Sequence, residues 1–117
     1  MEDKKYDLEN RCFLFAKRIR AFLKNVPFSM SNREDSIQLI RSSGSTGANY
    51  IEGNDGVSRK DFLYRAKVCR KESKKSTYWL NLIDIEGKAE LEQEHKSLIQ
   101  ESIELHKIFI SIIKKFE

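Results

Sequence analysis

The amino-acid sequence predicts an all-α protein that folds as a single domain, residues 1–117, in an antiparallel, up-down-up-down four-helix bundle. Apolar residues recur at helical spacing in four long segments. The breaks between these segments are short and contain proline or the turn formers asparagine, aspartate and glycine. Short connections make consecutive helices pack antiparallel, and 117 residues suffice to bury one core without disulfides or metal.

The first two helices are separated by a proline. We expect the first helix at residues 8–26, because Pro27 disfavours helical backbone at the residue before it. The second helix is expected at residues 33–53, with Asn32 as its N-cap. Acidic residues in its first turn complement the positive end of the helix dipole.

The third and fourth helices are delimited by turn residues. Asn54 to Gly56 form a predicted turn, and Ser58 is then a suitable N-cap because an acidic residue follows three positions later. The third helix is expected at residues 59–86, and Gly87 supplies a left-handed residue at its end. The fourth helix is expected at residues 89–116.

The composition predicts a cytoplasmic protein without a membrane span. No stretch of about 18 apolar residues exists, which excludes a membrane-spanning helix. The first residues are charged and lack the apolar run of a secretory signal, which favours a cytoplasmic address. Cys12 and Cys69 lie among apolar residues and form no CxxC pair, so we expect two buried, reduced thiols.

Positive charge is concentrated in the first three predicted helices. Residues 1–83 carry 17 Lys or Arg against 10 Asp or Glu, whereas residues 84–117 carry 5 against 8. One sector of the third helix, roughly 60° to 180° around from Phe62, is basic. We predict that this sector contacts nucleic-acid phosphates, and the alternative is an ordinary solvated face. The sector consists of Arg59, Lys60, Lys67, Arg70, Lys71 and Lys74.

The third helix is apolar on two sides, one more than a small bundle needs. Its core stripe runs from Phe62 through Cys69 to Ile83. A second cluster, rich in aromatic residues, lies roughly 200° to 260° around from Phe62. We predict that this cluster is a homo-oligomer interface, and the alternative is a scatter of surface apolar residues. The predicted interface consists of Tyr64, Val68, Trp79 and Leu82.

The second helix carries a narrow stripe of small and aliphatic residues that includes Gly44 and lies beside Gly47. Each glycine lowers helix stability by about 1 kcal/mol relative to alanine, so we expect a close backbone approach there. A polar line borders the stripe. We predict a hydrogen-bonded network at a helix or subunit junction, and the alternative is a solvated edge. The polar line consists of Arg41, Ser45, Asn49 and Glu52.

No catalytic residue, cofactor or metal site is predicted. Glu92 and His95 form one Glu-x-x-His pair, the unit of di-iron bundles. Such a centre needs a second pair, and His106 has isoleucine three residues before it. No serine or cysteine has a recognisable base partner, and the glycines of the second helix lack the lysine of a phosphate-cradling loop. A metal-dependent enzyme is therefore the weakest of the functions considered.

Five segments resemble the four-helix bundle proteins first noticed in intervening sequences of bacterial 23S ribosomal RNA genes. The most specific segment is Arg41–Gly53, which includes the polar line. Lys75 stands where many relatives have glutamate, which makes this side of the third helix more basic. The other segments are Ser58–Phe62, Lys71–Leu80, Glu101–Leu105 and Ile108–Lys115.

The resemblance implies a four-helix protomer that assembles as a homopentameric ring and has no enzymatic activity. It also extends to the accessory proteins of diversity-generating retroelements, which contact nucleic acid and a reverse transcriptase. Together with the basic sector, this leads us to predict a non-enzymatic homo-oligomer, a pentamer by resemblance, that binds RNA, DNA or a nucleoprotein partner. The alternative is a protein-interaction scaffold without nucleic-acid contact.

Overall fold

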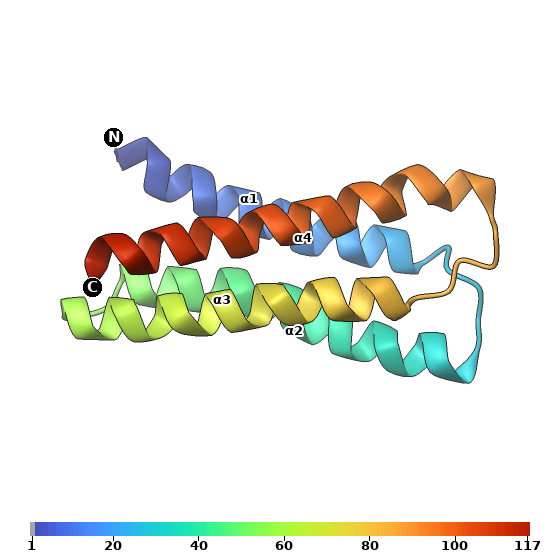
Figure 1. The fold of residues 1–117 in the computed structure, drawn as a ribbon, viewed down its shortest axis with the longest axis horizontal. Coiled ribbons are helices and arrows are strands. Elements are labelled where there is room, and N and C mark those ends of the chain that lie inside the picture. Colours follow the sequence, from blue (N-terminus) through green and yellow to red (C-terminus); the bar gives the residue numbers. More distant parts are fainter. Residues whose placement is uncertain (1) are drawn as a thin grey trace.

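Four long helices joined by three short connections make up the computed structural model, which describes residues 2–117 and the side chains from Asp7 onwards (Figure 1). The helices are α1 (Glu2–Leu23), α2 (Met30–Asn54), α3 (Arg59–Leu82) and α4 (Ala89–Phe116). Successive helices run in opposite directions, and α4 closes the bundle on α1 (Figure 1). The predicted up-down-up-down four-helix bundle is confirmed.

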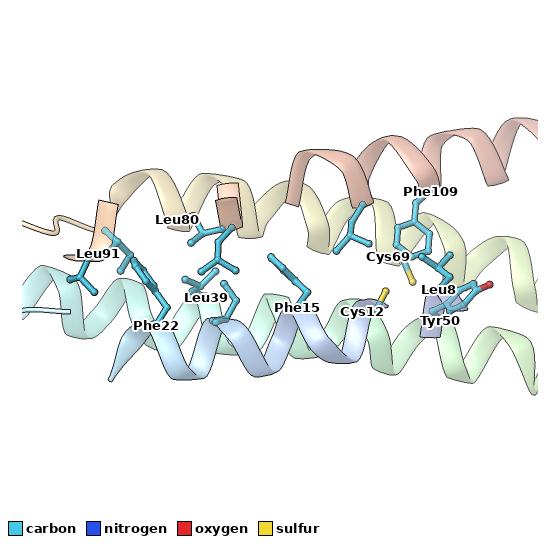
Figure 2. Packing of buried hydrophobic residues seen from close by; sticks show 14 residues of the cluster. Leu8, Cys12, Phe15, Phe22, Leu39, Tyr50, Cys69, Leu80, Leu91 and Phe109 are labelled. Atoms are coloured by element: carbon cyan, nitrogen blue, oxygen red, sulfur yellow. The ribbon is translucent and has the colours of Figure 1, made fainter. Parts of the chain in front are cut away.

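The core contains large apolar side chains from all four helices. Phe15, Leu39 and Leu80 are fully buried and are directed into the space between the helices (Figure 2). The predicted core stripe of α3 is buried from Ala66 to Leu80, while Phe62 at its start is half-buried. Burial of apolar surface stabilises the fold by about 25 cal/mol for each Å² removed from water.

Small hydroxyl side chains bring α3 close to both of its neighbours. The hydroxyls of Ser42 on α2 and Ser76 on α3 lie 2.8 Å apart, and both residues are buried. On the other side of α3, the Thr77 and Ser102 hydroxyls lie 2.6 Å apart. Each pair satisfies polar groups that would otherwise lower stability inside the core.

The connection between α1 and α2 differs from the prediction. α1 ends at Leu23, before the predicted end at residue 26, and α2 begins earlier than predicted, at Met30. The N-cap of α2 is Ser29, whose Oγ accepts a hydrogen bond of 3.0 Å from the backbone N–H of Asn32. The prediction of Asn32 as the N-cap is therefore wrong.

Asn32 instead ties two distant connections together. Its side-chain amide donates to the backbone oxygens of Pro27 and Asp84, at 3.0 and 2.8 Å. Its Oδ1 accepts from the backbone N–H of Asp84 at 2.9 Å. This buried amide thus holds the α1–α2 connection against the α3–α4 connection at one end of the bundle.

The end of α3 also differs from the prediction. α3 ends at Leu82, and the next residue, Ile83, is extended and buried. The predicted end at residue 86 is wrong because the chain turns away to make the Asp84 contacts with α2. Gly87 has the left-handed φ of 71° that the sequence suggested, and it lies in the connection rather than at the helix end. Ser58 is the N-cap of α3 as predicted, and its Oγ accepts from the backbone N–H three residues later at 3.1 Å.

Across residues 2–117, no helix combines the length and apolar character needed to cross a bilayer.

Candidate nucleic-acid interface

The predicted basic sector lies on the outer side of α3, where it borders α4. Lys60, Lys67, Lys71 and Lys74 are exposed, and Arg70 is half-buried. Four exposed ammonium groups on one side of a helix produce a positive potential that attracts phosphate without selecting a base.

Arg59, the first residue of the sector, is engaged with the last turn of α4. Its Nη2 donates to the backbone oxygen of Phe116 at 2.9 Å, and its guanidinium lies 5.5 Å from the centroid of that ring. Nearby, the ammonium of Lys67 lies 3.8 Å from the Glu117 carboxylate. The part of the sector least compensated by these contacts is therefore its second half, Arg70, Lys71 and Lys74.

Two adjoining hollows between α3 and α4 form a continuous depression, the α3–α4 groove. Their volumes are about 780 and 480 Å³. Both are lined by Lys74, His106 and Ile110, which makes them continuous. The larger hollow is also lined by Tyr64, Lys67, Val68, Arg70 and Lys71. The smaller hollow is also lined by Thr77, Tyr78, Ile103 and Lys107.

Three acidic residues of α4, Glu94, Glu101 and Glu104, are directed toward α1 and not toward this groove. Arg11 on α1 donates two hydrogen bonds to the Glu101 carboxylate, at 2.7 and 2.8 Å. Arg18 makes a similar bidentate contact with Glu94, at 3.0 and 2.9 Å. The acidic side of α4 is thus paired with α1. The side that reaches the groove carries Lys107, so the groove is basic on both walls even though α4 has a net negative charge.

His106 is the titratable group shared by the two hollows. Its ring is half-buried, and its Nδ1 is buried with no hydrogen-bond partner among the described residues. Burial, followed by the positive charges of Lys74 and Arg70, lowers the pKa of His106. The imidazole is therefore neutral at pH 7, and the charge of the groove comes from its lysines and arginine.

The polar line lies along the boundary between α2 and α3. The side-chain amide of Asn49 donates to the backbone oxygen of Ser45 at 2.9 Å, and its Oδ1 accepts from Nη1 of Arg65 at 2.8 Å. Arg41 and Glu52 are exposed. One member of the line, Asn49, thus belongs to a helix junction whose partner, Arg65, was not singled out in the sequence.

The four residues of the predicted oligomer interface differ in exposure. Tyr64 and Leu82 are 61% and 46% exposed, and Val68 is half-buried. Trp79 is half-buried and packs against the core. Its Nε1 is buried and has no hydrogen-bond partner within residues 2–117. A homo-oligomer interface at these residues stays a prediction.

Comparisons with known proteins identify the family of this chain. A family model described as "23S rRNA-intervening sequence protein" matches residues 4–111. The chain belongs to this family. A similar solved structure is a protein of unknown function from the S23 ribosomal protein family of Bacteroides thetaiotaomicron. The two chains are 31% identical with a TM-score of 0.75, over 92% of this chain and 98% of that one. No curated protein matches the chain.

This member of the family has a second groove that the sequence did not predict. It lies between α1 and α2, has a volume of about 460 Å³, and is lined by Phe13 and Ile51, which are 57% and 47% exposed. A Cβ atom at Gly47 would lie 3.2 Å from the Cβ of Cys12, so the expected close backbone approach occurs at this glycine. At Gly44 the nearest atom to such a Cβ is the flexible end of Arg20, 3.5 Å away, which is an ordinary contact.

The remaining candidates for chemistry have structural roles. Cys12 and Cys69 are free and buried, and burial raises the pKa of each thiol to about 12. Nε2 of His95, from the Glu-x-x-His pair, lies 2.7 Å from the backbone oxygen of Leu80. Among the residues that the structure describes, no group of three or more His, Cys, Asp or Glu side chains is placed to hold a metal ion.

Proposed function

We propose that this protein is a non-enzymatic homo-oligomer that binds nucleic acid through the α3–α4 groove. One observation carries the proposal. Cationic side chains of two helices, α3 and α4, converge on one concave surface, while carboxylates of α4 are paired with arginines of α1. Such a surface lowers the free energy of a bound polyanion, and the carboxylates of Glu94 and Glu101 do not compete for its cations.

The family description supports RNA as the first ligand to test, since it names ribosomal RNA. Lysine ammonium groups contact phosphate as point charges, so the expected binding depends on shape and charge more than on sequence. The proposed compartment is the cytoplasm, where the two free thiols would stay reduced.

The test is a titration of a labelled, structured RNA at several salt concentrations. Lys71→Glu with Lys74→Glu reverses two exposed charges of the groove and avoids Lys67, which is close to Glu117. If both lysines contact phosphate, the slope of log affinity against log salt should flatten by about 1.4 to 1.8. Lys24→Glu with Lys88→Glu makes the same change in net charge at exposed positions outside the lining of the groove.

The two variants separate local contacts from overall charge. An equal effect of both double variants would show that only the net charge matters, which rejects the groove as the binding surface. Absence of any RNA binding at low salt would reject nucleic-acid binding altogether. The protein-interaction scaffold would then be the better hypothesis.

We further propose that the homo-oligomer is a ring, pentameric by analogy with relatives, built through the side of α3 that carries Tyr64, Val68, Trp79 and Leu82. Tyr64 and Val68 also line one edge of the larger hollow, so the ring covers that edge and leaves Lys71, Lys74 and the smaller hollow for nucleic acid. Supporting observations are the exposed aromatic and aliphatic side chains there and the unpartnered indole nitrogen of Trp79 among the described residues. Leu82→Glu should dissociate the oligomer with helix content intact, because it places a charge in the interface. The readouts are mass by light scattering and helix content by circular dichroism.

Phe13→Glu is the matched comparison, because Phe13 is a similarly exposed apolar residue in the groove between α1 and α2. Dissociation by Leu82→Glu alone supports the proposed interface. Dissociation by Phe13→Glu alone would move the interface to the α1–α2 groove. A parent chain that is monomeric at all concentrations would reject the homo-oligomer.

A further inference from the structure

The smaller hollow of the α3–α4 groove has a property that phosphate binding does not require. Its walls include Tyr78, Ile103 and Ile110. The hollow, with a volume of about 480 Å³, therefore has apolar and aromatic sides with lysines beside them. Phosphate oxygens gain nothing from isoleucine or from a tyrosine ring. A ligand that uses the whole hollow therefore has a negative charge next to a flat or apolar group.

Tyr78 presents an aromatic ring at this hollow. The residue is 60% exposed, and its ring packs edge-on against Trp79, with centroids 4.9 Å apart and an interplanar angle of 74°. An edge-on neighbour restricts the ring without covering it from both sides. Tyr78 is thus a partly ordered aromatic surface open to a ligand.

Positively charged side chains flank this aromatic surface on both walls of the hollow. Lys74 lies on the α3 wall of the hollow and Lys107 on the α4 wall, so cations flank the apolar part from two helices. His106, also in the wall, is a neutral aromatic ring because burial and nearby cations lower its pKa. The hollow therefore combines two flat rings with two flanking ammonium groups.

We propose that the smaller hollow receives an unpaired base of a single-stranded nucleic-acid segment. The base stacks on Tyr78, and the adjacent phosphates contact Lys74 and Lys107. This inference rests on the proposed function and specifies its ligand class. A duplex keeps its bases paired and stacked, and extruding one base costs a few kcal/mol, so the hollow favours unpaired segments over duplex.

The experiment compares two RNA probes of equal length with the purified chain. One is single-stranded with a 2-aminopurine at a central position, and the other is the same strand paired to its complement. Base–aromatic stacking is worth about 1 to 3 kcal/mol, so Tyr78→Ala should weaken single-strand binding by roughly 5- to 150-fold. Duplex affinity should not change, and Tyr78→Phe should retain single-strand affinity.

Additional variants test whether the lysines of the hollow contribute to binding. Lys74→Gln and Lys107→Gln should weaken both probes and reduce their salt dependence. The fluorescence of the 2-aminopurine should change on binding to the parent and to Tyr78→Phe, and change less on binding to Tyr78→Ala. Phe28→Ala removes an 83% exposed aromatic side chain outside the groove and should have no effect on either probe.

The outcomes distinguish this inference from the proposed function. If neither probe binds at low salt, the proposed function fails, and the base site fails with it. If both probes bind and Tyr78→Ala changes neither, the groove binds nucleic acid and the base site is wrong. Equal binding of a free mononucleotide would reject a strand as the ligand. Binding of polyglutamate as tight as that of the single strand would reject a nucleotide ligand.

Discussion

Nη1 of Arg65 on α3 donates a hydrogen bond of 2.8 Å to Oδ1 of Asn49 on α2. The same guanidinium lies 5.4 Å from the centroid of the Tyr64 ring. Arg65 therefore connects the polar line of α2 with the outer side of α3, where the oligomer interface is proposed. A substitution at this junction affects the alignment of α2 and α3, which pack extensively against each other.

Asn49→Ala should lower the free energy of unfolding by about 1 to 2 kcal/mol. The variant removes a hydrogen bond to a charged, partly buried group and leaves the Arg65 guanidinium without this acceptor. Urea unfolding monitored by circular dichroism measures the change. Glu52→Ala, at an exposed position of the same polar line, is the control and should change stability much less. An equal loss in both variants would show that the contact between Asn49 and Arg65 does not stabilise the bundle.

The positions of the helices could be predicted because they depend on local features. Apolar periodicity located all four helices, and the bounds of α4 were predicted correctly. Ser58 caps α3 through a neighbour three residues away, which is visible in the sequence. The side chain of Asn32 bonds the backbone of Asp84, 52 residues away, so no local pattern could reveal why α3 ends early.

Only half of the candidate interface could be predicted. The lysines of α3 form a basic sector within one helix, and helical geometry alone brings them together. The other wall comes from α4, whose net charge is negative and suggested no role in anion binding. The spacing of Ile103, His106 and Ile110 follows a second helical side of α4, and this pattern was the available signal. Which side of α4 meets the basic sector is decided by burial of its apolar stripe, which includes Leu98 and Phe109, and the ion pairs with α1 agree with that orientation.

The hydroxyl pair between α2 and α3 should behave as one unit. Ser42→Ala or Ser76→Ala alone leaves a buried hydroxyl without its partner and should lower stability by about 1 to 3 kcal/mol. The double variant should be much closer to the parent than the sum of the two losses. A double-mutant cycle by urea unfolding measures this coupling. The control cycle combines Ser42→Ala with Ser102→Ala on α4, which does not pack against α2, and should be additive. Additivity in both cycles would contradict the pairing.

Two glycines of α2 should respond to alanine in opposite directions. The nearest atom to a Cβ at Gly44 is the flexible end of Arg20, 3.5 Å away, so Gly44→Ala should raise stability by about 1 kcal/mol through helix propensity. A Cβ at Gly53 would lie 3.0 Å from the Cβ of Arg65 and 3.4 Å from the Phe62 ring. Gly53→Ala should therefore push α3 outward and lower stability, by about 1 to 3 kcal/mol. Thermal unfolding measures both, and stabilisation by both variants would show that α2 and α3 are less tightly packed at Gly53 than the structure indicates.

His106 should make the stability of the bundle depend on pH in the mildly acidic range. Its pKa in the folded protein is lowered by burial first, then by Lys74 and Arg70, relative to about 6.5 in an unfolded chain. As pH falls, the unfolded state therefore binds the proton before the folded state does. The stabilisation is complete above the unfolded pKa and is lost as pH falls through the folded pKa.

The measurement is the free energy of unfolding in urea at pH 7.5 and at pH 5.5, for the parent and for His106→Leu. The parent should lose more stability between the two conditions than the variant, which has no titrating group at this position. His95 is present in both proteins, so its contribution cancels in the comparison. An identical pH dependence would mean that the imidazole is as well solvated in the folded protein as in the unfolded chain. The wall of the groove would then not contain a ring that burial keeps neutral.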